Sequence, residues 1–402
     1  MLETLQPLTT LAEKRLAERF THPVRLEPTA KLDSQHLVVR YRVHAGDPVF
    51  PNTLILKQVN DDSKVIAQFT PRTLFLNEWA SLEFLSGLTS DCSPQLYASD
   101  RTEQFVLLED LGECPSVQEI LYGDDPARAH AALIEWGALL GRMQRATRGH
   151  ESRFRALQME LGATTSLSDG YFDLRVELPL LRECLHTLEI PLPDGFDAAI
   201  AAIASAMCDP SPFRSFAHFD AGPHNGLLTP NGIRLLDFEL AGFGHGLIDV
   251  VGARMAFPAA YRGRRVPMAS VQALEASYRA EIVHASPELA EDRVFYPALV
   301  QACAHWAFVR IWGFWKSYLK NRLEIGPDYE NQRNIKPENA AYFRTMVLTY
   351  LISFIETAET FGELSSLRII AEQVMDALRR IWPELEPWPV YPAFQPEQTA
   401  EL

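Results

Sequence analysis

One polar segment near the middle of the 402-residue chain constrains its fold more than any other feature. Asn231-Gly232 separates the apolar runs GLLT and IRLLDF. Asn-Gly is the strongest two-residue signal for a β-hairpin, because both central residues of a type I′ turn need positive φ. A hairpin centred on this pair places Asp237 opposite Gly226 and next to Asn225. The segment therefore predicts a carboxylate and a carboxamide at the open end of one hairpin.

A second carboxylate precedes this hairpin. Asp220 lies five residues before Asn225, on a loop that contains Gly222 and Pro223. Carboxylate and amide oxygens are hard ligands, and Mg²⁺ usually takes few protein oxygens and shares its other positions with phosphates and water. With Asp237, these residues predict a site for Mg²⁺ and a phosphorylated ligand.

The order His218-x-Asp220-x-x-x-x-Asn225, followed by Asp237, resembles the catalytic and metal-binding signature of the protein-kinase-like fold. The segments HFDAGPHN, LLDFE and GLIDVV are most similar to the aminoglycoside phosphotransferase and choline kinase superfamily. Sequences of that superfamily read H-G-D-x-x-x-x-N, then I-D-[WFY]-E, then D-[LV]-[AV]. The resemblance is ordered along roughly residues 20–255, and the remainder matches only in being helical.

The upstream sequence continues the resemblance. Lys57 lies in the β-rich run LILKQV, where the fold places its phosphate-contacting lysine, and Glu78 lies in the following helix, where the partner of that lysine sits. FVLLEDLG, residues 105–112, resembles the hinge between the two lobes. The resemblance implies that backbone groups from Glu109 to Leu111 bind the edge of adenine.

Two positions depart from the family pattern. Phe219 follows His218, where family members commonly have Gly. Between the first two strands, LEPTAKLDSQHLVV contains no glycine. The resemblance then implies that Ser34 or Gln35, together with backbone amides, covers the phosphates in place of a glycine-rich loop.

The resemblance also implies roles on the acceptor and metal side. Phosphoryl transfer depends mainly on positioning and on neutralisation of charge. Asp220 is expected to accept or orient the proton of the acceptor hydroxyl, with His218 orienting the catalytic loop and Asp249 stabilising it from below. Asn225 and Asp237 are expected to hold Mg²⁺ across the phosphates of ATP. Lys57 is expected to neutralise phosphate charge, and Glu78 to fix its rotamer.

The pattern of elements predicts an α+β fold. β-rich runs dominate the first hundred residues, and one helical pattern at about 72–87 interrupts them. Further along, Asp125-Pro126 supplies an N-cap and a proline at the first helical position, and helical spacing then prevails. We expect a bilobal protein-kinase-like fold. Its nucleotide-binding lobe, 1–109, has a small antiparallel sheet with one helix, and its catalytic and acceptor-binding lobe, 110–402, is larger and mostly helical.

Composition limits the partners. Lys and Arg number 37 against 52 Asp and Glu, and the formal charge of −15 disfavours duplex nucleic acid and an anionic membrane surface. No apolar run approaches the roughly 18 residues that span a bilayer. Five scattered cysteines without a C-x-x-C pair disfavour a disulfide framework and suit a reducing cytoplasm. We expect a cytoplasmic protein that acts on a small-molecule hydroxyl acceptor, and its oligomeric state stays open.

The expected activity is transfer of phosphate from ATP, with Mg²⁺, to a hydroxyl of a small molecule; the acceptor and the choice of ATP over GTP stay open. Two other activities remain. A metal-dependent phosphohydrolase would use His218, Asp220, His224, Asp237 and His245. Such an enzyme needs neither the amide–carboxylate hairpin nor Lys57. A catalytically inactive nucleotide-binding pseudokinase is favoured by the missing glycine-rich loop and disfavoured by the intact Asp220, Asn225 and Asp237.

Aromatic residues gather in the helical segment 305–319. Phe308, Trp312 and Trp315 fall at i, i+4 and i+7, a spacing typical of a stripe that packs into the core. The other interpretation is a wall of the acceptor site that binds an ammonium group by cation–π interactions. Arg310, in the same segment, argues against a cationic acceptor if it faces that site.

Overall fold

The computed structural model describes residues 5–32, 37–46, 50–59, 69–89, 91–163, 173–209, 211–260, 263–326, 329–333 and 335–395. The chain forms two compact units. The first comprises Met1–Ser116, Ala146–Ser168 and Asn225–Gly242, and the second comprises Val117–Arg145, Asp169–His224 and Phe243–Leu402. These units are assembled from separate segments, whereas the two lobes expected from the sequence were each continuous. The assignment of nucleotide binding to one lobe and acceptor binding to the other stays a prediction.

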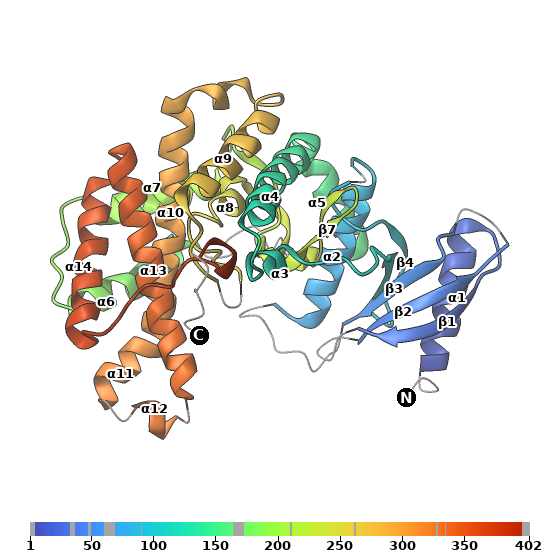
Figure 1. The fold of residues 1–402 in the computed structure, drawn as a ribbon, viewed down its shortest axis with the longest axis horizontal. Helices are drawn as coiled ribbons and strands as arrows, with labels where there is room; N and C mark the ends of the chain where they lie inside the picture. The colour runs from blue at the N-terminus through green and yellow to red at the C-terminus, as the bar shows by residue number, and fades with distance from the viewer. Residues whose placement is uncertain are drawn as a thin grey trace, which may run out of the picture. The chain divides into compact units, whose positions relative to one another are not determined.

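A five-stranded antiparallel sheet organises the first unit (Figure 1). Its strands are β1 (Arg25–Lys31), β2 (Leu37–His44), β3 (Thr53–Gln58), β4 (Leu96–Asp100) and β5 (Phe105–Glu109). They lie in the order β1-β2-β3-β5-β4. Alternate residues of β2 and β3, among them Val39, Tyr41, Leu54 and Leu56, are fully buried, which accounts for the period of two in the sequence.

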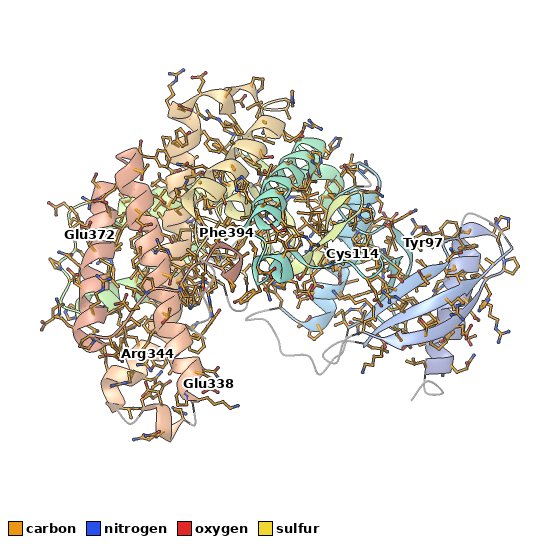
Figure 2. All side chains as sticks on the ribbon, viewed as in Figure 1. Tyr97, Cys114, Glu338, Arg344, Glu372 and Phe394 are labelled. Carbon is orange, nitrogen blue, oxygen red and sulfur yellow. The ribbon has the colours of Figure 1, made fainter. Side chains whose placement is uncertain are left out.

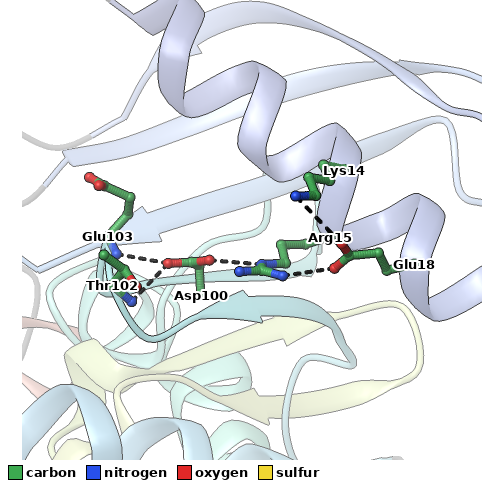
Figure 3. A network of polar contacts seen from close by, with 6 residues as sticks. All are labelled: Lys14, Arg15, Glu18, Asp100, Thr102 and Glu103. Carbon is green, nitrogen blue, oxygen red and sulfur yellow. Dashed lines mark hydrogen bonds and ion pairs between the residues drawn. The ribbon is translucent and has the colours of Figure 1, made fainter.

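Helix α1 (Gln6–Phe20) packs against β1 and β4. Its Phe20 ring lies 6.0 Å from that of Tyr97 on β4, which Figure 2 labels. Figure 3 shows a polar contact between the same elements, in which Arg15 Nε donates to Asp100 at 2.8 Å. Burial raises the pKa of Asp100, but the backbone N–H groups of Glu103 and Thr102 and the Arg15 guanidinium outweigh it and lower the pKa. The buried carboxylate therefore stays charged and ties α1 to the sheet.

Helix α2 (Pro71–Ser86) is the expected helix of the first unit. Thr70 caps it by accepting a hydrogen bond from the Thr73 N–H at 3.2 Å, and Pro71 fits the first helical turn because its missing N–H has no partner there anyway. Helix α5 (Glu151–Leu161) and the hairpin of β7 (Gly226–Thr229) and β8 (Gly232–Leu235) complete this unit, with the short turn η3 (Phe238–Leu240) after β8.

The second unit is mostly helical, with a two-stranded sheet of β6 (Arg214–Ala217) and β9 (Gly242–His245). Its helices are α3 (Val117–Leu121), α4 (Pro126–Thr147), α6 (Leu174–Thr187), α7 (Phe196–Cys208), α8 (Leu247–Val250), α9 (Met268–Ile282), α10 (Asp292–Phe314), α11 (Lys320–Ile325), α12 (Tyr329–Gln332), α13 (Pro337–Phe361) and α14 (Ser365–Ile381). Short 3₁₀ turns are η2 (Pro223–Asn225), η4 (Pro287–Ala290) and η6 (Pro392–Phe394), and the π-helical turn η5 (Trp315–Leu319) joins α10 to α11. Figure 1 shows α10, α13 and α14 side by side, and α13 contacts both neighbours.

The helix signals of the sequence are confirmed in this unit. Asp125 caps α4 by accepting from the Arg128 N–H at 2.9 Å. Phe308 and Trp315 are buried, and the Phe308 ring packs 6.1 Å from that of Phe354 on α13, so core packing accounts for both residues. The expected α+β fold class is confirmed as well. None of the helices within the described ranges is long and apolar enough to cross a membrane.

Candidate active site

Lys57 and Glu78 form an enclosed ion pair in the first unit. Lys57 lies on β3 between Val38 of β2 and Val106 of β5. Its Nζ donates to both carboxylate oxygens of Glu78, on α2, at 2.8 Å. The two side chains are only 11% and 3% exposed. Lys57 and Glu78, which the sequence predicted to be partners, are therefore in direct contact. Their role in binding a nucleotide stays a prediction.

Asn77 fixes the position of α2 beside this pair. Its Nδ2 donates to the backbone oxygens of Glu239 and Ala241 at 3.0 and 2.8 Å. Its Oδ1 accepts from Gln158 of α5 at 2.7 Å. Asn77 is 1% exposed, and these bonds replace the hydrogen bonds to water that its side chain loses on burial. Its neighbour Glu78 is thereby held against the segment that follows β8; nothing in the local sequence marks Asn77 for this task.

The hairpin of β7 and β8 is present, but its turn lies one residue earlier than expected. Thr229 pairs with Gly232, so Pro230 and Asn231 form the loop, and the prediction of a turn centred on Asn231-Gly232 is wrong. Pro230 has no N–H and cannot be the strand residue that closes an Asn-Gly turn. Its fixed φ suits the second position of a type I turn, and Gly232, with φ of 104°, follows as the fourth residue.

The shifted register changes which residues face each other at the open end. Leu235 faces Gly226, and the expected pairing of Asp237 with Gly226 is wrong. Beyond this pair, the Leu236 N–H donates to the backbone oxygen of Asn225 at 2.7 Å. Asn225 is thus bonded to the residue immediately before Asp237. The carboxamide and the carboxylate still belong to one end of one hairpin.

Asp237 directly precedes η3 and lies in the left-handed region, with φ of 62°. Its carboxylate forms an ion pair with Lys57 Nζ and is 46% exposed. Burial lowers the pKa of Lys57, but the carboxylates of Asp237, Glu78 and Glu239 outweigh it and raise that pKa above its ordinary value. Burial raises the pKa of Glu239 to about 7, against the lowering effect of Lys57. Glu239 is not among the predicted site residues, although it is the final Glu of the LLDFE match.

A cavity of about 260 Å³ lies within the first unit beside these charges. It is lined by Val38, Ile55, Lys57, Glu78, Leu82, Pro94, Leu108, Leu236, Asp237 and Phe238. Ligand pockets usually measure about 300–1,000 Å³, so this one suits a planar ring between apolar side chains rather than a whole nucleotide. Lys57 and Asp237 give the same cavity a charged part of its wall.

The segment after β5 offers backbone groups to a ligand. The Glu109 N–H already donates to the Gln95 oxygen at 2.8 Å, and the Glu109 carboxylate accepts from Arg234 at 2.7 Å. The Leu111 oxygen accepts from the Cys114 thiol at 3.2 Å. Within the residues that the structure describes, the Leu111 N–H has no acceptor. Leu111 rather than the Glu109 N–H is therefore available to bind the edge of a base.

In the second unit, a buried carboxylate shapes the loop that follows β6. Asp249 of α8 accepts hydrogen bonds from the backbone N–H groups of His218 and Phe219 at 2.6 and 2.9 Å. Burial raises its pKa to about 7, and these two hydrogen bonds act in the opposite direction. The Asp220 N–H donates to His218 Nδ1 at 3.3 Å, which places the proton of the neutral imidazole on Nε2. Asp249 and His218 together set the backbone from which Asp220 projects.

The structure shows how Phe219 fits at a position where family members commonly have glycine. It has φ of 61°, in the region that favours glycine. Its ring occupies the space beside Gly244 of β9, where an added Cβ would lie 2.6 Å from Phe219 Cζ. A non-glycine residue therefore adopts this conformation here because a glycine on the facing strand makes room for its ring.

The predicted site residues fall into two groups. The first unit holds Lys57, Glu78, Glu109, Leu111, Asn225 and Asp237, and the second holds His218 and Asp220. Ser34 lies outside the described residues, so the expected cover over the phosphates stays a prediction. Of the histidines considered for a phosphohydrolase, His245 is buried and stacks on Phe213 with ring centroids 4.8 Å apart. No cluster of three or more His, Cys, Asp or Glu side chains able to hold a metal ion occurs among the described residues.

A protein-family model described as "Phosphotransferase enzyme family" matches residues 54–286, more than half of the chain. The matched segment includes every predicted site residue except Ser34 and Gln35. No protein with a curated description shows significant sequence similarity to the chain.

Several solved structures share distant similarity. Choline kinase from Cryptosporidium parvum Iowa II is 12% identical, with a TM-score of 0.48, over 92% of this chain and 99% of that one. A choline/ethanolamine kinase family protein from Mesorhizobium loti is 15% identical, with a TM-score of 0.42, over 90% and 99%. APH(2″)-IIa in a ternary complex with streptomycin and ATP is 14% identical, with a TM-score of 0.42, over 80% and 95%.

Proposed function

The chain belongs to the phosphotransferase enzyme family, and from this premise we propose that it transfers the terminal phosphoryl group of ATP, with Mg²⁺, to a hydroxyl group of a small molecule. One observation carries the proposal. The enclosed Lys57–Glu78 pair and the exposed Asp237 carboxylate line one cavity with apolar walls. That combination suits a ligand with a flat base and a charged phosphate chain.

Lys57 is proposed to contact the phosphates. Glu78 holds its ammonium group through two hydrogen bonds, so the side chain is fixed before any nucleotide arrives. The pKa of Lys57 is raised, so the amine stays charged at neutral pH. Apolar side chains such as Ile55 and Leu108 would cover the faces of the base, and the Leu111 N–H would bind its edge.

Asn225 and Asp237 are proposed to hold Mg²⁺. A carboxylate and an amide oxygen are the hard donors that Mg²⁺ prefers, and the 46% exposure of Asp237 leaves it open to a ligand. The hydrogen bond from Leu236 to Asn225 ties the two residues into one stretch of backbone. When bound, Mg²⁺ supplies neutralisation of the phosphate charges.

Asp220 is proposed to act on the acceptor. The acceptor oxygen forms a bond to the terminal phosphorus, the bond from phosphorus to the bridging oxygen of ADP breaks, and the hydroxyl proton passes to the Asp220 carboxylate. The hydrogen bonds among Asp249, His218 and the Asp220 backbone orient that carboxylate before the substrate binds. Pre-set groups of this kind are how such enzymes lower the barrier.

We place this activity in the cytoplasm. All five cysteines belong to described segments and are free thiols, which suits a reducing compartment. The net charge of −15 is compatible with small-molecule partners rather than nucleic acid.

Melting curves and a coupled assay of ADP release test the proposal. Mg-ATP at a hundred times its dissociation constant should stabilise the full chain by about 2.7 kcal/mol, and EDTA should remove most of the effect. Asp237→Ala should lose the Mg²⁺-dependent part, whereas Asp376→Ala, at an exposed position of α14, should match the wild type. ADP release should appear with at least one alcohol from a broad panel. Absence of both a melting shift at millimolar Mg-ATP and any ADP release would overturn the proposal.

A further inference from the structure

Arg310 on α10 is held in a fixed position within the second unit. Its guanidinium carbon lies 5.4 Å from the ring centroid of Trp306 and 5.8 Å from that of Tyr350 on α13. Its Nη2 donates to the backbone oxygen of Pro258 at 2.5 Å. The two rings and the carbonyl together fix the orientation of the guanidinium group.

This cation has no counterion on the described part of the chain. Arg254, in the same unit, is paired with Glu275 through two hydrogen bonds of 2.7 Å. Arg310, by contrast, forms no ion pair with any described residue, and its Nε is buried without an acceptor. With Nη2 bonded to Pro258, Nη1 is the end of the guanidinium left for a partner. Arg310 is half-buried, and water compensates such a charge less well than an anionic partner would, so an anion that binds Nη1 would stabilise it.

A phenol beside Arg310 is also without a partner. The Tyr350 hydroxyl is buried and has no acceptor or donor among the described residues. Burial raises its pKa above the ordinary value, so the phenol stays protonated at neutral pH and remains a hydrogen-bond donor. Arg310 and Tyr350 thus place two unsatisfied donors side by side, one of them cationic. Such donors are satisfied by an oxygen that carries negative charge.

The Pro258 segment connects Arg310 to the catalytic loop. Ala259, which follows the carbonyl bonded to Arg310, lies against Gly222: a Cβ on Gly222 would be 3.5 Å from the Ala259 carbonyl carbon. The Gly222 N–H in turn donates to the Asp220 backbone oxygen at 2.7 Å. Only a few consecutive contacts therefore separate Arg310 from the loop that bears Asp220.

The same segment is strained. Ala256 and Phe257, directly before Pro258, have φ of 55° and 53°, and neither is a glycine. Left-handed residues of this kind cost about 1–2 kcal/mol each and persist where the surroundings impose them, which is common at functional sites. The Phe257 N–H bond to the Gly252 oxygen, at 2.6 Å, helps to keep the segment in this shape.

We propose that Arg310 binds an anionic group, a carboxylate or a phosphate, of the hydroxyl acceptor, an inference that rests on the phosphotransferase function proposed above. The aromatic faces of Trp306 and Tyr350 support an anion rather than an ammonium group. Both rings already carry the Arg310 guanidinium, so they are not free for a substrate cation, and Arg310 itself repels one. The acceptor is therefore a hydroxy acid or a hydroxylated phosphate ester.

Binding of inorganic sulfate tests the anion site without knowledge of the acceptor. The nucleotide cavity is first filled with Mg²⁺ and a non-hydrolysable ATP analogue, so that sulfate cannot bind where phosphates would. Melting temperature is then followed against sulfate concentration. The wild type and Arg293→Gln, whose side chain is 84% exposed, should respond alike, and any general stabilisation by sulfate is common to both.

Arg310→Gln should weaken the saturable part of the sulfate response at least tenfold, since a charge-assisted hydrogen bond is lost. Arg310→Lys keeps the charge but loses the planar fork, and should fall between the two. If Arg310→Gln does not fold, Arg310→Lys alone decides the matter. Sulfate curves identical to the wild type in the folded variants would overturn the proposal.

Turnover with alcohols of matched size tests the acceptor class. With Mg-ATP, a panel of hydroxy acids and hydroxylated phosphate esters is compared with glycerol and choline. An anionic compound should have the highest kcat/KM, and Arg310→Gln should raise its KM tenfold or more with a smaller change in kcat. Preference for glycerol or choline that Arg310→Gln leaves unchanged would overturn the anion site. Absence of turnover with every compound and of any Mg-ATP melting shift would instead reject the phosphotransferase function, and the sulfate response would still decide whether the anion site exists.

Discussion

Lys57 and Glu78 form a buried ion pair, and its contribution to stability can be separated from its proposed role in phosphate transfer. Lys57→Met leaves the Glu78 carboxylate, 3% exposed, without its buried partner. Breaking such a pair costs about 3–5 kcal/mol, because the remaining charge stays desolvated. We expect urea unfolding to show that loss for Lys57→Met. The double variant Lys57→Met/Glu78→Leu should recover most of it, because the Glu78 carboxylate is removed together with its partner, and Glu239, whose pKa burial raises to about 7, can take up a proton.

The double variant separates the two roles. It should fold nearly as well as the wild type yet transfer phosphate at least a hundredfold more slowly, since the cation proposed to contact the phosphates is gone. Wild-type transfer by the double variant would contradict the role of Lys57. A single variant as stable as the wild type would contradict the energetic argument.

A substitution at Asp220 distinguishes an effect on the chemical step from an effect on nucleotide binding. A carboxylate that takes or orients the acceptor proton acts mainly in the transition state, so its loss should lower kcat far more than ATP affinity. Such roles are worth about 10²–10⁴ in rate. Asp220→Asn keeps the shape of the side chain, and we expect it to fold, to bind Mg-ATP within a few-fold of the wild type and to transfer phosphate at least a hundredfold more slowly. Steady-state kinetics with a calorimetric ATP titration measures both, and near-normal transfer would contradict the assignment.

At the scale of elements, the loop after β6 and strand β9 fit each other through one aromatic ring. In Gly244→Ala the new Cβ would lie 2.6 Å from Phe219 Cζ, so the ring or the strand must shift. Overpacking of this kind costs about 1–3 kcal/mol. Phe219→Gly removes the ring and also relieves the left-handed backbone.

A double-mutant cycle of these two positions tests the fit. Phe219→Gly/Gly244→Ala should be more stable than the sum of the single variants predicts, with a coupling of about 0.5–3 kcal/mol by urea unfolding. kcat should recover together with stability in the double variant, because the Asp220 loop regains its support. Strictly additive free energies of unfolding would show that the ring and the strand do not constrain each other.

At the scale of the whole molecule, two buried histidines make stability depend on pH. Burial lowers the pKa of His245 to about 3 and that of His305 to about 4. In the unfolded chain both take up a proton near pH 6.5, whereas in the folded chain they stay neutral to far lower pH. The unfolded state therefore binds more protons below pH 6.5. Stability is fully present above that pH and falls as the pH drops, by about 1.4 kcal/mol per pH unit for each histidine.

His305→Leu should remove one of these two contributions. We expect its free energy of unfolding in urea to fall less steeply than that of the wild type between pH 6.5 and pH 5, by about 1.4 kcal/mol per pH unit. His284→Gln, at an exposed position after α9, is the control and should parallel the wild type. Parallel pH curves for His305→Leu and the wild type would contradict the burial argument.

Features that depend on neighbouring residues along the chain could be predicted from the amino-acid sequence. Asp125 predicted the start of α4 because an N-cap needs only its own side chain and the next turn of backbone. The β-rich run LILKQV predicted β3 for the same reason. The order of Lys57, Glu78 and Asp237 matched a family pattern and predicted that these residues belong to one site. It did not provide their distances, and their catalytic roles remain predictions.

The tertiary structure decided what depends on distant segments. The register of the hairpin is different, because Pro230 is a local signal: pairing of strands requires an N–H that proline lacks, and the turn lies one residue earlier than the Asn-Gly pair predicts. Phe219 adopts its left-handed backbone because Gly244, on another strand, leaves room for its ring. Arg310 is an ordinary residue of an aromatic helix in the sequence, and only packing of α10 against α13 and the Pro258 segment shows a cation without a counterion. The space around a side chain and the charges near it depend on every segment that packs against it. The local sequence does not specify which segments those are.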